Sequence, residues 1–279
     1  MMNSNRQTNP IRLLALDMDG TVLLEDKTIS PRVQTAISAA VANGVDVVPA
    51  TGRAAVGIPE AFLSVAKSHY AITANGARVV NLQTGETMLE ELIPQDLALI
   101  AFDALQKYDC VLDLFQNGKG YSTPANVRLN DRLLPENLRE YVSNSRVIID
   151  DMRAFVETQT QGIEKWTMFF GTETERLAAW DEMKALGFEV VSSLPRNMEL
   201  SAPGVSKGNG LVLLAKLLNL PLSQTMACGD GGNDLTMIAM AGVGVAMENG
   251  MDEVKAAADF IAPSNEADGV ALAIEHFIL

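Results

Sequence analysis

The sequence predicts an α/β protein, in which a doubly wound, mostly parallel sheet is interrupted by an inserted α+β domain. At both ends of the 279-residue chain, short apolar runs alternate with helix-length amphipathic segments, the pattern of strands joined by crossover helices. The middle of the chain instead has strand patterns joined by short turns, which indicates hairpins on mixed or antiparallel strands. We expect the outer domain to comprise residues 1–83 and 196–279, and the inserted domain residues 84–195.

The outer domain begins with an apolar run at residues 13–16, typical of a strand that is buried on both faces. Ser30 and Pro31 then form an N-cap and first-turn pair, and they open a helix that Gly44 closes. Further strands are expected at residues 45–50, 70–73, 225–228, 243–246 and 260–262. Further helices are expected at residues 208–218, 233–241, 252–258 and 269–277.

The inserted domain has a different pattern. A hairpin over residues 77–89 leaves the sheet, and an amphipathic helix follows at residues 94–108. A second hairpin turns at Asn117-Gly118. The remaining elements are a strand at 165–170, a helix at 173–186 and a strand at 188–191.

Composition limits the classes of function. The formal net charge of −14 disfavours nucleic acid or an anionic membrane as partner, and an anionic substrate would need a local positive site or a metal. No stretch approaches the ~20 apolar residues of a membrane span, and residues 1–10 lack the apolar centre of a signal peptide. Cys110 and Cys228 are too few for a disulfide framework or a zinc site. We expect a cytoplasmic protein with a small-molecule partner, and the sequence carries no signal for its oligomeric state.

Polar side chains follow the predicted strands of the outer domain. The first strand runs into Asp17 and Asp19, and a turn at Gly20 can bring both carboxylates into one pocket. Thr51 follows the second strand. Ligands of open α/β sheets bind at the carboxyl ends of the strands, so we expect these side chains to line one site. Each alone also fits a polar turn or a helix cap.

Two more candidates lie near the other end of the chain. Lys207 opens a helix whose dipole disfavours a cation, which favours an anion held between them, although a solvated surface lysine is the alternative. Residues 229–234, Gly-Asp-Gly-Gly-Asn-Asp, follow a strand, and their two acids and amide suit a hard cation. A glycine-rich turn with an aspartate helix cap is the alternative there.

As a set, these residues suit phosphoryl transfer. Four carboxylates, a hydroxyl, an amide and a lysine would meet at one edge of one sheet. This set supplies a nucleophile, an acid and positive charge around the phosphoryl oxygens. Mg²⁺ would be held by a few protein oxygens and by the phosphate.

With these motifs, the sequence resembles the haloacid dehalogenase-like (HAD) phosphatases. Their four motifs are matched, in order, by Asp17-Met18-Asp19-Gly20-Thr21, Thr51, Lys207 and residues 229–234. The position of the insert resembles the Cof-type branch, as do Ala50-Thr51-Gly52-Arg53, Asn75-Gly76 and residues 242–247. The insert's own sequence is far less diagnostic.

The resemblance implies a HAD-like core and a role for each matching residue. Asp17 would be the nucleophile that forms an aspartyl-phosphate, and Asp19 the acid that protonates the leaving oxygen and then activates water. Mg²⁺ would be bound by Asp17, the backbone carbonyl of Asp19 and Asp230, while Asp234 would tune water or Lys207. The phosphate would be bound by Thr51, Gly52, Lys207 and Asn233, and candidate substrate contacts are Arg53 and Asn75. The insert would be a cap that closes over the site and selects the substrate.

The sequence therefore predicts a Mg²⁺-dependent phosphatase for small phosphorylated metabolites, such as sugar phosphates or related phosphomonoesters. A sugar-phosphate mutase with the same motifs stays open, and it would need cap cations for a second phosphate. The candidate cations are Lys119, Arg128, Arg132, Arg139, Arg146, Arg153 and Lys165. A non-catalytic receiver-type phospho-acceptor also uses Asp, Thr and Lys on a doubly wound sheet, but it lacks the second acid of the Asp17–Asp19 pair and needs no domain-sized insert.

Overall fold

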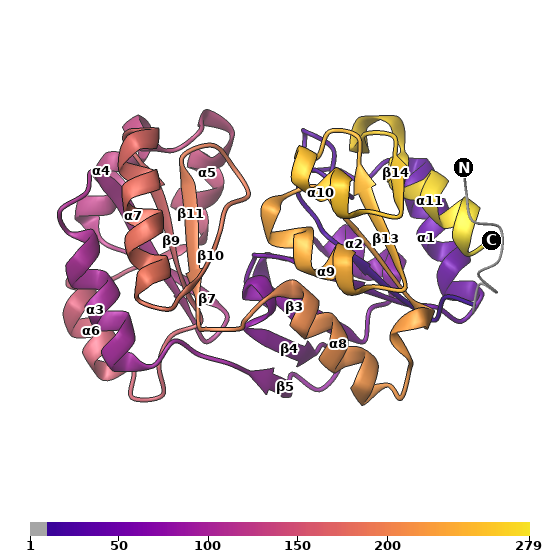
Figure 1. The fold of residues 1–279 in the computed structure, drawn as a ribbon, viewed down its shortest axis with the longest axis horizontal. Helices are drawn as coiled ribbons and strands as arrows, with labels where there is room; N and C mark the ends of the chain where they lie inside the picture. Colours follow the sequence, from indigo (N-terminus) through magenta and orange to yellow (C-terminus); the bar gives the residue numbers. More distant parts are fainter. Residues whose placement is uncertain (1–9) are drawn as a thin grey trace.

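The computed structural model describes residues 10–279, which form two units that lie side by side (Figure 1). The unit with the carboxyl terminus, which we call the core, is built on a parallel sheet, and the other unit, which we call the cap, on a mostly antiparallel sheet. Within residues 10–279 no helix combines the length and apolar character that crossing a membrane requires. The expectation of no signal peptide rests mainly on residues 1–9, which lie outside the described part of the chain.

The predicted parallel sheet is present. Its strands are β1 (Leu13–Leu16), β2 (Asp46–Pro49), β12 (Thr225–Gly229), β13 (Val243–Met247) and β14 (Phe260–Ala262). Their order is β14-β13-β12-β1-β2, and every pairing is parallel. The central strand is buried on both faces, because Leu14 and Leu16 pack into one hydrophobic cluster and Leu13 and Ala15 into another.

Helices cover both faces of this sheet, which confirms the doubly wound prediction. One face packs against α1 (Pro31–Ala42), α2 (Glu60–Ala66) and α11 (Gly269–Phe277). The other face packs against α8 (Lys207–Leu217), α9 (Leu235–Met240) and α10 (Asp252–Ala257). Ser30 caps α1 by accepting a hydrogen bond from the backbone N–H of Val33. Short 3₁₀ turns are η1 (Ala55–Gly57), η2 (Ala74–Gly76), η3 (Leu222–Gln224), η4 (Gly232–Asp234) and η5 (Asn265–Ala267).

The third predicted strand differs from expectation. β3 (Tyr70–Thr73) pairs antiparallel with β4 (Arg78–Asn81), which pairs with β5 (Thr87–Glu90) in a separate small sheet. An isolated parallel bridge between Ala50 and Ile72 links β3 to the segment that follows β2. The turn at Asn75 and Gly76, with φ of 59° and 97°, reverses the chain directly after β3, so β4 becomes its partner.

The cap is built on a six-stranded sheet of order β10-β11-β9-β6-β7-β8. Its strands are β6 (Cys110–Gln116), β7 (Lys119–Ser122), β8 (Arg146–Ile148), β9 (Lys165–Phe170), β10 (Glu189–Val191) and β11 (Asn197–Ser201). All neighbours are antiparallel except β7 and β8. Alternate residues such as Trp166 and Met168 pack under α3 (Gln95–Leu105), α6 (Met152–Thr158) and α7 (Glu173–Ala185).

Residues 124–158 and β11 were not predicted from sequence. The first segment folds into α4 (Pro124–Leu133), α5 (Glu136–Ser145), β8 and α6. The start of α4 does carry a sequence signal for a helix. Thr123 accepts a hydrogen bond from the backbone N–H of Asn126, and Pro124 occupies the first turn.

The strand pairing favours domain limits that differ from the expected ones at both ends of the cap. β5 lies beyond residue 83 yet pairs with β4, and β11 lies beyond residue 195 yet pairs with β9 and β10 in the cap. Hydrogen bonding across a sheet, which a local pattern does not reveal, decides to which unit these strands belong. We therefore propose that the cap begins after Glu90 and ends after Ser201.

Candidate active site

The site forms where β1 and β12 end beside each other. The register pairs Leu16 with Cys228, and the backbone N–H of Asp17 donates to the carbonyl of Cys228 over 3.0 Å. Asp17 and Asp230 therefore emerge at the same edge of the sheet, as the sequence predicted.

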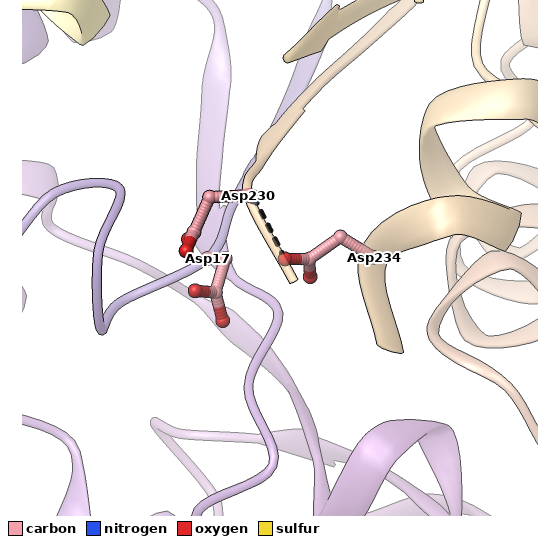
Figure 2. Close-up of side chains that lie close together, drawn as sticks. All are labelled: Asp17, Asp230 and Asp234. Carbon is pink, nitrogen blue, oxygen red and sulfur yellow. Dashed lines mark hydrogen bonds between the residues drawn. The ribbon is translucent and has the colours of Figure 1, made fainter. Parts of the chain in front are cut away.

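A third carboxylate joins this pair. Carboxylate oxygens of Asp17, Asp230 and Asp234 all lie within 4.8 Å of one another, and Figure 2 shows the three side chains close together. Asp234 Oδ2 is held by the backbone N–H groups of Asp230 and Gly231, at 3.0 and 2.9 Å. A Cβ at Gly229 would lie 2.5 Å from Asp234 Cβ, so this close approach requires glycine.

Lys207 lies between two of these carboxylates. Its ammonium, on a side chain that is 0% exposed, is 2.6 Å from both Asp17 Oδ1 and Asp234 Oδ1. Burial lowers the pKa of Lys207, but Asp17 and Asp234 outweigh that effect and raise it above its usual value. The lysine is therefore a fixed positive charge at the first turn of α8.

One lysine does not neutralise three crowded carboxylates, of which Asp17 and Asp234 are buried and Asp230 is half-buried. Burial, followed by the charge of Asp234, raises the pKa of Asp17 well above its usual value and that of Asp230 to about 7. Thr21 Oγ1 donates to Asp230 Oδ1 over 2.8 Å and opposes part of the shift. Crowded carboxylate oxygens with a deficit of positive charge are a donor set that suits Mg²⁺.

Asp19 points to a different set of partners. Arg53 Nε and Nη2 donate to its two oxygens over 2.8 and 2.7 Å, and Lys27 Nζ lies 2.8 Å away. Burial raises the pKa of Asp19, but Arg53 and then Lys27 lower it to about 2. In this arrangement the carboxylate is ionised, so it can accept a proton, and donating one requires Arg53 to move away.

Arg53 is also held by one contact within the core and one with the cap. Its Nη1 donates to the carbonyl of Gly57 over 2.8 Å, and its guanidinium lies 5.1 Å from the ring centre of Tyr141 on α5. The sequence had placed Arg53 among the candidate substrate contacts, but it gave no sign that Tyr141 or Lys27 would lie near.

The remaining predicted residues gather beside the carboxylates. Thr51 is buried, and its Oγ1 accepts from the backbone N–H of Arg53 over 3.1 Å. Asn233 Nδ2 donates to Asn75 Oδ1 over 3.1 Å. A Cβ at Gly52 would lie 2.9 Å from that same oxygen. The structure thus brings Thr51, Gly52, Asn75 and Asn233 together.

Two charged cap residues complete the site. Lys165 Nζ is 3.0 Å from Glu199 Oε1, and Glu199 Oε2 accepts from Asn75 Nδ2. Burial lowers the pKa of Lys165 although Glu199 opposes the shift, and the charges of Arg146 and Lys207 add to the lowering. Sequence reasoning missed Glu199, although a signal existed: Asn197, Glu199 and Ser201 alternate with apolar residues, the period of a strand with one polar face.

Comparison with known proteins identifies the class. The chain matches the family model of haloacid dehalogenase-like hydrolases over residues 14–274, and it belongs to this family. It is 31% identical over 279 residues to 5-amino-6-(5-phospho-D-ribitylamino)uracil phosphatase YcsE of Bacillus subtilis (strain 168), with 100% of both chains covered. It is 28% identical over 294 residues to YbjI of Escherichia coli (strain K12), a phosphatase of the same name, with 93% of each covered.

A solved structure agrees. The haloacid dehalogenase-like hydrolase from B. subtilis matches with a TM-score of 0.85 at 28% identity, covering 96% of this chain and 100% of that one. The chain is a phosphatase of the Cof-type branch, and so a phosphoric monoester hydrolase.

Proposed function

We propose that the protein is a Mg²⁺-dependent phosphatase for small phosphorylated metabolites that works through an aspartyl-phosphate on Asp17. The observation that carries this proposal is the contact of buried Lys207 with both Asp17 and Asp234 at the strand ends. Lys207 holds one carboxylate oxygen of Asp17 in place beside a fixed positive charge, where a phosphoryl group can be attacked.

Catalysis takes place in two steps. In the first, Asp17 attacks phosphorus, the ester P–O bond breaks, and the leaving oxygen takes a proton from Asp19. In the second, water attacks phosphorus, Asp19 accepts its proton, and the acyl-phosphate bond breaks to restore Asp17. The hydrogen bonds from Arg53 favour the ionised Asp19 that the second step needs.

The other residues hold the phosphoryl group and the metal. Phosphoryl oxygens are bound by Thr51, Gly52, Lys207 and Asn233. Mg²⁺ would be held by Asp17, the backbone carbonyl of Asp19 and Asp230, and it would supply the positive charge that the three crowded carboxylates and a phosphate dianion lack. Asp234 positions Lys207 and the loop after β12 through its contacts with the lysine and two backbone N–H groups.

The substrate class is a sugar phosphate or a related phosphomonoester. YcsE and YbjI are named for a substrate with a phosphorylated ribityl chain, which supports a hydroxylated leaving group. The net charge of −14 disfavours nucleic acid and anionic membranes as partners, and we propose that the enzyme acts in the cytoplasm.

Phosphatase is preferred to mutase because of the charges on the cap. Of the cap cations proposed for a second phosphate, Arg146 and Lys165 are the buried ones, and each has a carboxylate partner, Asp113 and Glu199. Arg132 and Arg153 pair with Asp109 and Asp103 on the exposed surface. No surplus of positive charge therefore faces the site from these four.

A panel of phosphorylated metabolites, assayed with and without Mg²⁺, tests the proposal. We expect release of inorganic phosphate that stops when EDTA removes the metal. Isomerised sugar phosphate as the main product would favour the mutase, and undiminished turnover after thorough chelation would rule out the metal-dependent reaction.

A further inference from the structure

The cap contributes one buried ion pair to the centre of the site. The side chains of Lys165 and Glu199 are 2% and 11% exposed, and they come from the neighbouring strands β9 and β11. Thr167 Oγ1 also donates to Glu199 Oε1 over 3.4 Å. The catalytic steps proposed above use neither residue of this pair.

The pair lies directly over the loop that binds the phosphate. A Cβ at Gly52 would lie 3.4 Å from Glu199 Oε2 and 3.5 Å from Lys165 Nζ. From Glu199 the polar contacts continue through Asn75 to Asn233, without a break between cap and core. A leaving group that extends from this loop toward the cap sheet therefore lies against this pair.

A second ion pair lies beside the first. Arg146 Nε is 3.1 Å from Asp113 Oδ2, and the ring of Phe115 lies between the two cations, 4.7 Å from Lys165 Nζ and 4.7 Å from Arg146 Cζ. Both cations are matched by acids, so this face offers hydrogen-bond donors and acceptors without net charge.

We propose that Lys165 and Glu199 determine specificity by hydrogen bonding the hydroxyl groups of a neutral, polyhydroxylated leaving group. A hydroxyl can donate to Glu199 and accept from Lys165 at once. An apolar leaving group would cover both charged groups and satisfy neither, and a second anion would face Glu199 without a surplus cation. This inference rests on the proposed function, and it adds the residues that recognise the rest of the substrate.

The test is the ratio of kcat/KM for sorbitol 6-phosphate to kcat/KM for phenyl phosphate, whose leaving groups differ in hydroxyls. For Lys165→Met we expect this ratio to fall roughly 100-fold, because a site built to bond hydroxyls can discriminate by more than this factor and the variant loses one of its two bonding groups. Glu199→Gln, which keeps the shape of the side chain, should lower it in the same direction. Turnover of phenyl phosphate by each variant shows that it has folded.

The matched control is Lys107→Met. Lys107 also belongs to a cap ion pair, with Glu182 at 2.8 Å, but its side chain is 58% exposed and it contacts Glu182 and Tyr108, which are not site residues. For Lys107→Met the ratio of the two kcat/KM values should stay within about threefold of wild type. If Lys165→Met and Glu199→Gln also leave the ratio unchanged, the pair only holds the cap in place and the inference is wrong. If the wild type hydrolyses neither ester with Mg²⁺, the proposed function itself fails.

Discussion

On the core side of the site three clustered carboxylates have one lysine, which contacts two of them, whereas on the cap side each buried cation has a carboxylate of its own. The core is thus incomplete without added positive charge, and the cap face is balanced as it stands. Unbalanced charge is useful where a metal and a phosphate, common to all substrates, must bind. Balanced polar groups are useful where neutral groups that vary among substrates must be distinguished.

The substitution that tests this comparison with the largest expected effect is Asp17→Asn. We expect turnover of every ester to disappear, because an amide is not a nucleophile. In metal-free buffer the Tm should not fall, because a neutral amide removes the burial of a charge and its repulsion by Asp234, which together raise the pKa of Asp17. Activity assays and thermal melts check both parts. A variant that kept about a tenth of the wild-type rate would have lost only ~1.4 kcal/mol of barrier, too little for a covalent role.

Removing magnesium is expected to have the next largest effect. The pKa of Asp230, raised to about 7, means that the metal-free protein loses stability as pH rises through that value and the group ionises. At about pH 8 Asp230 is already ionised, so Mg²⁺ displaces fewer protons when it binds than at about pH 5.5. It should therefore raise the Tm more at the higher pH. Melts with Mg²⁺ and with EDTA at both pH values measure this. A larger shift at the lower pH would mean that these carboxylates do not bind the metal.

Lys207→Met sharpens the contrast between core and cap. Lys207 contacts Asp17 and Asp234, and its proposed partners in the substrate are phosphoryl oxygens, which all esters share, so kcat/KM should fall for all esters together. Removing one partner from this buried cluster should also lower the free energy of unfolding by about 3 kcal/mol. Urea denaturation and the ester panel provide the two measurements. Losses confined to some substrates would reverse the division of roles between core and cap.

The smallest expected effect is at Gly52, where core and cap meet. A Cβ there would lie 2.9 Å from Asn75 Oδ1, so Gly52→Ala must displace Asn75. We expect the free energy of unfolding to fall by about 1–3 kcal/mol, as for overpacked sites, and kcat/KM to fall modestly for all esters. Denaturation curves and the same panel check this. An unchanged variant would show that the contact between Asn75 and the loop is loose.

The sequence was most informative where position along a strand decides position in space. Asp17 and Asp230 could be predicted together because the carboxyl ends of neighbouring parallel strands meet at one edge. Thr51 and Lys207 followed from the same reasoning, since one ends a strand and the other begins a helix.

The sequence was least informative where the position of a residue depends on how the cap packs against the core. Glu199 and Tyr141 reach the site only because the cap lies against the core, and no local pattern reports that contact. Lys27 depends on the fold of the loop after β1. The cap limits that we propose differ from the expected ones because β5 and β11 are assigned by their strand partners, which a local pattern does not reveal.

The central claim, that the core reacts through Asp17 whatever the leaving group, is tested most directly by trapping the intermediate. Asp19→Asn removes the base of the second step, whereas the good leaving group of ³²P-labelled p-nitrophenyl phosphate allows the first step to proceed without an acid. After acid quenching and peptide mapping, we expect the label on the peptide that contains Asp17. Release of p-nitrophenol with no label on the protein, or label on a different residue, would contradict the account.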